Sequence, residues 1–118
     1  MYKLKFNLPG LPKTANGSHG HWRTAAAERK KWRSAVSSSA FYFRPPAPLA
    51  RARITLTRLS SSKPDFDNLV ISFKPIVDGL KDAKIILDDS DSVVLERCYL
   101  WEKAKPKSGG VRVFVEEI

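Results

Sequence analysis

Residues 50–80 read ARARITLTRLSSSKPDFDNLVISFKPIVDGL, and this stretch decides the fold because its hydrophobic period changes half-way. From Ala50 to Thr57, small or apolar residues alternate with arginine and threonine, which is the period of a half-buried strand. The run SSSKP at 60–64 then favours a turn. After it, apolar residues recur at the spacing of one helical face, at Leu69, Phe73, Ile76, Val77 and Leu80. We therefore predict a strand, a turn and a helix in succession.

The flanking sequence predicts further elements on both sides. Alternation predicts strands over 2–8, 93–101 and 111–115, and an amphipathic pattern predicts a basic helix over 23–40. The run 9–22, rich in Gly and Pro, is typical of a long loop, and Gly109-Gly110 of a hairpin turn between the last two strands. The order strand, helix, strand, helix, strand, strand predicts one small α+β domain over residues 1–118, with two main helices against a mixed sheet.

The length of 118 residues fits a single domain whose buried surface a dimer interface would enlarge. The one cysteine, Cys98, lies in a strand-like run and is typical of an ordinary core thiol in a reducing compartment. The alternating residues after Met1 do not form the apolar region of a signal peptide, and no apolar run has the length of a membrane span. We expect a soluble, cytoplasmic protein with no membrane partner and no organic cofactor.

Charge is distributed unevenly along the chain, whose formal net charge is +9. Residues 1–58 carry +11 and residues 59–118 carry −2. A strongly basic half is typical of a polyanion binder, and nucleic acid is the commonest such partner. A solvated surface beside an ordinary acidic half gives the same count, so charge alone leaves both interpretations open.

The acidic residues include two short groups, Asp65 with Asp67 and, about twenty residues later, Asp88 with Asp89. If the backbone is extended at the first group, both of its carboxylates share a face near the start of the predicted helix. Neighbouring strand ends would bring the second group beside them. Such oxygen ligands select Mg²⁺, or Mn²⁺ in its place, over zinc. Taken singly, Asp65 is more simply explained as a helix N-cap, and Asp88-Asp89 as a turn.

Lys74 follows Asp67 by seven residues, two helical turns, and so projects along the same face of the predicted helix. That position suits a lysine that holds a phosphate or stabilises the charge that builds when water attacks it. A surface salt bridge with Asp78, four residues further on, explains Lys74 equally well.

These residues resemble the signature of the RusA family of Holliday-junction resolvases. That signature is Asp-x-Asp-Asn-Leu, a helix bearing Lys and then Asp-Ala-Leu or Asp-Gly-Leu, and an Asp-Asp pair after a short apolar run. Here the matching positions are residues 65–69, Lys74, residues 78–80 and Asp88-Asp89. Residues 8–12, with Asn16 and His21, are similar to the N-terminal strand and DNA-contacting loop of the family. One departure is the presence of three additional residues, Val70-Ile71-Ser72, which add nearly one helical turn before the lysine.

The resemblance implies a Mg²⁺-dependent homodimer that resolves four-way DNA junctions by paired symmetric nicking, in DNA recombination and repair. It implies that Asp65, Asp67 and Asp89 are catalytic acids that bind the metal, with Asp88 beside them, and that Lys74 is the catalytic lysine. The expected DNA contacts are basic or loop residues: Lys13, Asn16, His21, Arg23, Arg29, Lys30, Lys31, Arg33, Arg51 and Arg53. Two other functions stay open, a non-catalytic binder of branched DNA and a nuclease for other branched DNA or structured RNA.

Overall fold

A computed structural model describes residues 1–13 and 22–118 of the chain. The elements follow one another as β1 (Lys3–Pro9), α1 (Trp22–Ala40), a short 3-10 helix η2 (Phe41–Phe43), β2 (Ala52–Ser60), α2 (Phe66–Asp82), β3 (Val94–Lys103) and β4 (Gly110–Glu117). The predicted order and the α+β class are therefore confirmed. The second helix begins at Phe66, three residues before the first apolar position of the predicted face at Leu69, and continues through Pro75.

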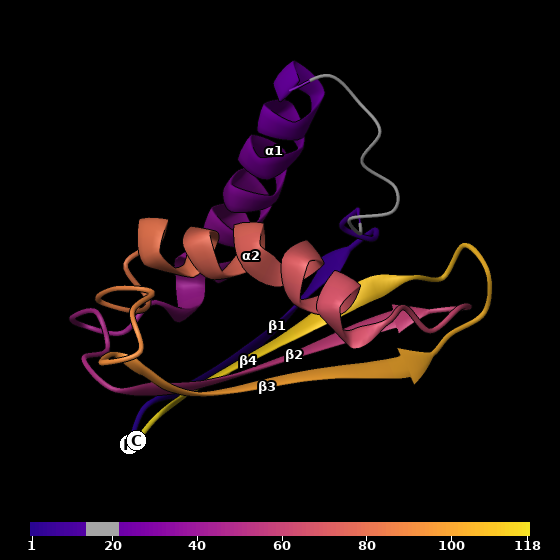
Figure 1. Cartoon of the computed structure of the whole chain (residues 1–118). Coiled ribbons are helices and arrows are strands. Elements are labelled where there is room, and N and C mark those ends of the chain that lie inside the picture. Colours follow the sequence, from indigo (N-terminus) through magenta and orange to yellow (C-terminus); the bar gives the residue numbers. More distant parts are fainter. Residues whose placement is uncertain (14–21) are drawn as a thin grey trace.

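The strands form one mixed sheet in the order β1-β4-β2-β3. Strands β2 and β3 are parallel and are joined through α2, whereas β4 runs antiparallel to both β1 and β2. Figure 1 shows both long helices on the same face of this sheet, with the two chain ends together at one edge of the molecule. The described residues thus form two layers, helices over a sheet whose other face carries no helix from residues 1–13 or 22–118.

The predicted hairpin between the last two strands is wrong, because β2 lies between β3 and β4 in the sheet. Both glycines of the predicted turn instead allow close packing. A Cβ on Gly110 would lie 2.8 Å from the carbonyl oxygen of Leu8, and one on Gly109 would lie 2.9 Å from the side chain of Leu11. The left-handed backbone of the connection occurs at Lys107, whose φ is 67°. A glycine pair indicates either a tight turn or close packing, and the sequence alone does not distinguish the two.

The core lies between the sheet and the helices. Alternate residues of β1, β2 and β4 point into it, as the burial of Leu4, Phe6 and Leu8 along β1 illustrates. The helices contribute the predicted apolar stripes, which are Trp32 and Val36 in α1 and Leu69, Phe73, Ile76, Val77 and Leu80 in α2. Among the helices that the structure describes, none is long and apolar enough to cross a membrane.

Candidate functional site

The first acidic group lies at the N-terminal end of α2. Asp65 occupies the N-cap position with an extended backbone (φ −61°, ψ 151°), and its side chain makes no capping hydrogen bond to this helix. Asp67 is already in the first helical turn, and both carboxylates are exposed. The extended backbone that we expected to align the two side chains is thus confined to Asp65. The positive end of the helix dipole still favours two ionised carboxylates here.

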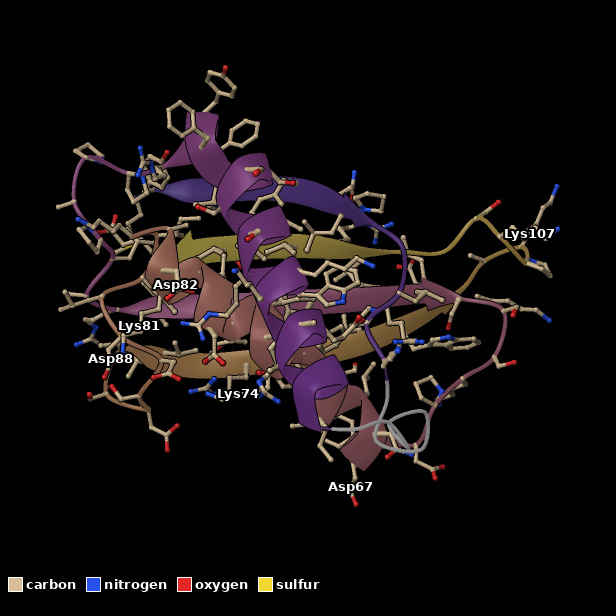
Figure 2. The ribbon with its side chains drawn as sticks, turned by 90° about the horizontal axis from the view of Figure 1, so that it is seen from above. Asp67, Lys74, Lys81, Asp82, Asp88 and Lys107 are labelled. Atoms are coloured by element: carbon tan, nitrogen blue, oxygen red, sulfur yellow. The ribbon has the colours of Figure 1, made fainter. Side chains whose placement is uncertain are left out.

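The second acidic group is held beside the same helix by backbone pairing. The Leu49 amide donates to the Ile85 carbonyl (2.9 Å), and the Leu87 amide donates to the Leu49 carbonyl (2.9 Å), so the chain emerges next to α2. Two lysines of α2 then contact the acids, as Figure 2 shows for Lys81 and Asp88. Asp88 lies 2.9 Å from the Lys81 ammonium.

Lys74 is the other lysine of α2 that contacts the second acidic group. Its ammonium lies 2.8 Å from an oxygen of Asp89 and 3.0 Å from an oxygen of Asp78, the residue four positions on. The salt bridge with Asp78 that the sequence allowed is therefore present, and the same ammonium also pairs with an acid of the Asp-Asp pair, while a role in holding a phosphate stays a prediction. In Figure 2 the Lys74 label lies between those of Asp67 and Lys81.

These lysines keep the second acidic group ionised. A hydrogen bond from Lys74 lowers the pKa of the Asp89 carboxyl to about 2. The same hydrogen bond, together with that to Asp78, raises the pKa of the Lys74 ammonium. The hydrogen bond from Lys81 likewise lowers the pKa of Asp88. At neutral pH the surface of α2 therefore presents fixed carboxylates interleaved with fixed ammonium groups.

The two acidic groups stand apart along α2. Asp67 precedes Lys74 by seven residues, which is about 10 Å along a helix axis, and Figure 2 shows Asp67 at the other end of α2 from Lys81 and Asp88. Within residues 1–13 and 22–118, no three His, Cys, Asp or Glu side chains are grouped closely enough to hold a metal ion. The carboxylates have the right chemistry for Mg²⁺, but as placed, Asp65, Asp67 and Asp89 do not fit around one ion.

The basic residues of α1 lie on its exposed surface. Arg29, Lys30 and Lys31 are all exposed, and Lys31 lies 5.7 Å from the ring centroid of the buried Trp32. Arg33 forms two hydrogen bonds to the Asp82 carboxylate of α2, of 2.5 and 2.8 Å. A hollow of about 510 Å³ runs along this surface and is lined by Ala26, Arg29, Lys30, Arg33, Ser34, Ser37 and Asp82.

On strand β2, the expected DNA contact Arg53 is paired with acidic residues of the neighbouring strands. Arg53 faces away from the helices in a row with residues of the neighbouring strands, and its side chain lies 2.5 Å from Glu96 and 3.6 Å from Glu116. Glu116 also lies 3.9 Å from Lys3. The reason is sheet register, because the C-terminal strands carry acids at the positions that flank Arg53. Arg53 is therefore paired within the sheet and does not add to the basic surface that α1 carries.

The remaining expected DNA contacts are placed less fully. Lys13 and Arg51 are exposed, the latter just before β2. Arg23 belongs to the first turn of α1, but its side chain is outside the description, and Asn16 and His21 lie outside the described residues. These positions stay predictions.

Sequence reasoning missed three contacts that shape the site. Lys81 follows Lys74 by seven residues, so helical spacing already placed both ammonium groups on one face of α2. Arg97 donates to the backbone carbonyl of Asp89 (2.6 Å) from β3, and Arg33 reaches Asp82 across the two helices. The last two contacts join residues that only the tertiary fold brings together, and no spacing in the sequence indicates them.

Two comparisons with known proteins found no match. No family model matches the sequence, and no curated protein matches it. Any assignment of function therefore depends on the residues, on their placement in the structure and on the resemblance stated from the motifs.

Proposed function

We propose that the chain is a Mg²⁺-dependent endonuclease that cuts branched DNA, with four-way junctions as its preferred substrate and a homodimer as its active form. One observation carries the proposal. Lys74 and Asp89, two separate parts of the motif that lie 15 residues apart, contact each other on the exposed side of α2. The ammonium and the carboxylate of the motif thus occur together despite the three additional residues in the helix.

The chemistry of the neighbouring groups supports this proposal. The Lys74 ammonium stays charged beside its two carboxylates, and release of one of these partners would free an N–H for a phosphate oxygen on an approaching strand. The basic residues of α1 supply the charge that attracts the backbone of that strand. Mg²⁺ would supply the neutralisation of charge that phosphodiester cleavage needs. The three motif aspartates do not surround one point. Dependence on Mg²⁺ is therefore proposed and is tested directly by the experiment below.

A second candidate is a branched-DNA-binding protein without nuclease activity. The separation of Asp67 from Asp89 favours it, as does the pairing of Asp89 with Lys74, which leaves that carboxylate neutralised by a side chain. In this case the acids of α2 and of the loop after it have a structural role, which is to hold Lys74 and Lys81 in place through ion pairs.

The deciding experiment uses labelled four-way junction, linear duplex and single strand, each with and without Mg²⁺. The proposal expects paired nicks in the junction only, and their loss in excess EDTA. Asp67→Asn and Asp89→Asn should each slow cleavage by about 100-fold or more, the scale for losing a group that acts on reacting atoms, while junction binding is retained.

Asp82→Asn is the matched control. It removes an acid of the same helix that pairs with Arg33 and belongs to no expected catalytic set, so cleavage should persist. Wild-type protein that binds the junction but does not nick it in Mg²⁺ or Mn²⁺ would establish the second candidate. Cleavage by Asp67→Asn at the wild-type rate would remove Asp67 from the site.

A further inference from the structure

Three consecutive aromatic residues are exposed immediately after α1. The side chains of Phe41, Tyr42 and Phe43, which form η2, are 56%, 88% and 44% exposed, whereas Ala40 just before them is fully buried. Single exposed apolar residues are common on protein surfaces, but adjoining ones form a patch that marks an interaction site. None of these residues belongs to the acidic site or to the basic surface of α1.

The aromatic segment is fixed on both sides. The Tyr2 hydroxyl donates a hydrogen bond to the Phe43 carbonyl, which ties η2 to the chain just before β1. Arg44 leaves the segment in extended conformation and leads into Pro45 and Pro46, whose rings restrict the backbone. The rings of Phe41 and Tyr42 pack edge to face with centroids 5.2 Å apart. A ligand that stacks on these rings would therefore lose little of its binding energy to ordering the chain.

Two basic groups lie beside the rings, whereas Tyr2 and Glu117 line a separate hollow with Pro45 and Pro46. The Arg44 guanidinium carbon lies 5.0 Å from the centroid of the Phe41 ring. A hollow of about 410 Å³ adjoins this pair and is lined by Phe41, Arg44, Pro45, Pro46, Pro48 and Lys84. Both charged residues of its lining are cations. Lys84 directly follows α2 and Ala83, with a left-handed backbone (φ 62°).

We propose that Phe41, Tyr42, Phe43, Arg44 and Lys84 form an aromatic platform that binds unpaired DNA. Bases stack on the exposed rings, and Arg44 and Lys84 hold the phosphates between them. The inference deepens the proposed function, on which it rests, because a branch point offers unpaired bases. Lys84 is four residues before Asp88, at most about 14 Å of extended chain, so the Lys84 end of the platform lies within that distance of the second acidic group.

Charge selects this occupant over a second copy of the chain. Two copies that met through the platform would bring Arg44 and Lys84 of each protomer towards like charges. A polynucleotide offers both a π face for each ring and an anion for each cation.

The test measures fluorescence anisotropy of a labelled twenty-nucleotide oligo(dT). All proteins carry Asp89→Asn, so that binding is measured in a chain that the proposed function expects not to cut. Phe41→Ala/Tyr42→Ala should bind at least about ten-fold more weakly, since each lost base stack costs roughly that factor. Ile71→Ala, which removes a side chain 54% exposed on α2, is the matched apolar control and should bind unchanged. Thermal melting of each variant checks that it is folded.

A strand of abasic residues separates stacking from charge. It should bind the parent protein weakly and should bind Phe41→Ala/Tyr42→Ala equally weakly. Equal affinity of that variant and its parent for oligo(dT) would overturn the platform. The platform would also be wrong if sedimentation showed that the variant breaks a dimer while its affinity for oligo(dT) stays unchanged. Nicking of junctions is assayed separately in wild-type protein, so failure of the nuclease and failure of the platform give different results.

Discussion

The Lys74 ammonium is shared between Asp78 and Asp89, and this single residue links α2 to the loop that carries the second acidic group. Lys74 follows Asp67 by seven residues, so about two helical turns separate it from the first acidic group. Asp89 reaches Lys74 because the backbone pairing of Leu49 with residues 85–87 brings the chain beside α2. At this scale, one lysine contacts the second acidic group and stands apart from the first.

We predict that the ion pair between Lys74 and Asp89 stabilises the fold and that this stabilisation is lost as the pH falls into the acid range. The folded-state pKa of Asp89 is about 2, below its ordinary value of 3.8. As the pH falls below about 4, the unfolded chain binds a proton at this position before the folded chain does, so the contribution of the pair is lost between about pH 4 and pH 2. Its size is at most about 1 kcal/mol, because the Lys74 side chain is 60% exposed.

Urea unfolding between pH 5 and pH 2 measures this effect. Wild type should exceed Asp89→Asn in free energy of unfolding at pH 5, and the two should converge by pH 2. Asp91→Asn, which removes a fully exposed carboxylate of the same loop, is the control. A difference between wild type and Asp89→Asn that stays constant over this pH range would contradict the assigned pair.

At the scale of elements, the contact between α1 and α2 depends on Gly79. A Cβ at this position would lie 2.8 Å from the Val36 Cβ and 3.2 Å from the Arg33 Cα. These atoms belong to or adjoin the backbone of α1, so they cannot move without shifting the helix. The spacing of the two helices therefore requires glycine at this position.

We therefore predict that Gly79→Ala destabilises the fold, although alanine is favoured over glycine within a helix by about 1 kcal/mol. Overpacking of this kind costs about 1–3 kcal/mol, which outweighs the gain. Chemical denaturation should show a lower free energy of unfolding than wild type. Ser38→Ala, at an exposed position of α1, controls for helix propensity and should be neutral or slightly stabilising. An unchanged or higher stability of Gly79→Ala would mean that the helices pack less closely than described.

The sequence predicted the elements better than their arrangement. Period alone located both long helices and each strand of the described residues, because alternation and helical spacing are properties of neighbouring residues. It did not predict that β2 inserts between β3 and β4, since strand order depends on contacts between distant residues. The same limit applies to the site. Spacing predicted the salt bridge between Lys74 and Asp78, but the backbone pairing of Leu49 with residues 85–87, which sets where Asp89 emerges, has no local signal.

At the scale of the whole molecule, the two sides of the domain differ in how their charges are paired. The exposed surface of α1 carries Arg29 and Lys30 beside a hollow. On the open face of the sheet, Arg53 pairs with Glu96 and Glu116, and Arg112 pairs with Glu102 at 3.2 Å. The affinity of a polyanion that binds through α1 should therefore depend on Arg29 and Lys30, and not on Arg53 and Arg112.

The salt dependence of duplex or junction binding tests this asymmetry. The slope of log K against log salt should fall in magnitude by about 0.9 for each phosphate contact removed, so Arg29→Ala/Lys30→Ala should lower it by about 2. Arg53→Ala/Arg112→Ala removes the same formal charge from the open face and should leave the slope near the wild-type value. Equal losses of slope in the two double variants would show that DNA responds to net charge alone. In that case α1 would not be the surface that contacts the phosphates.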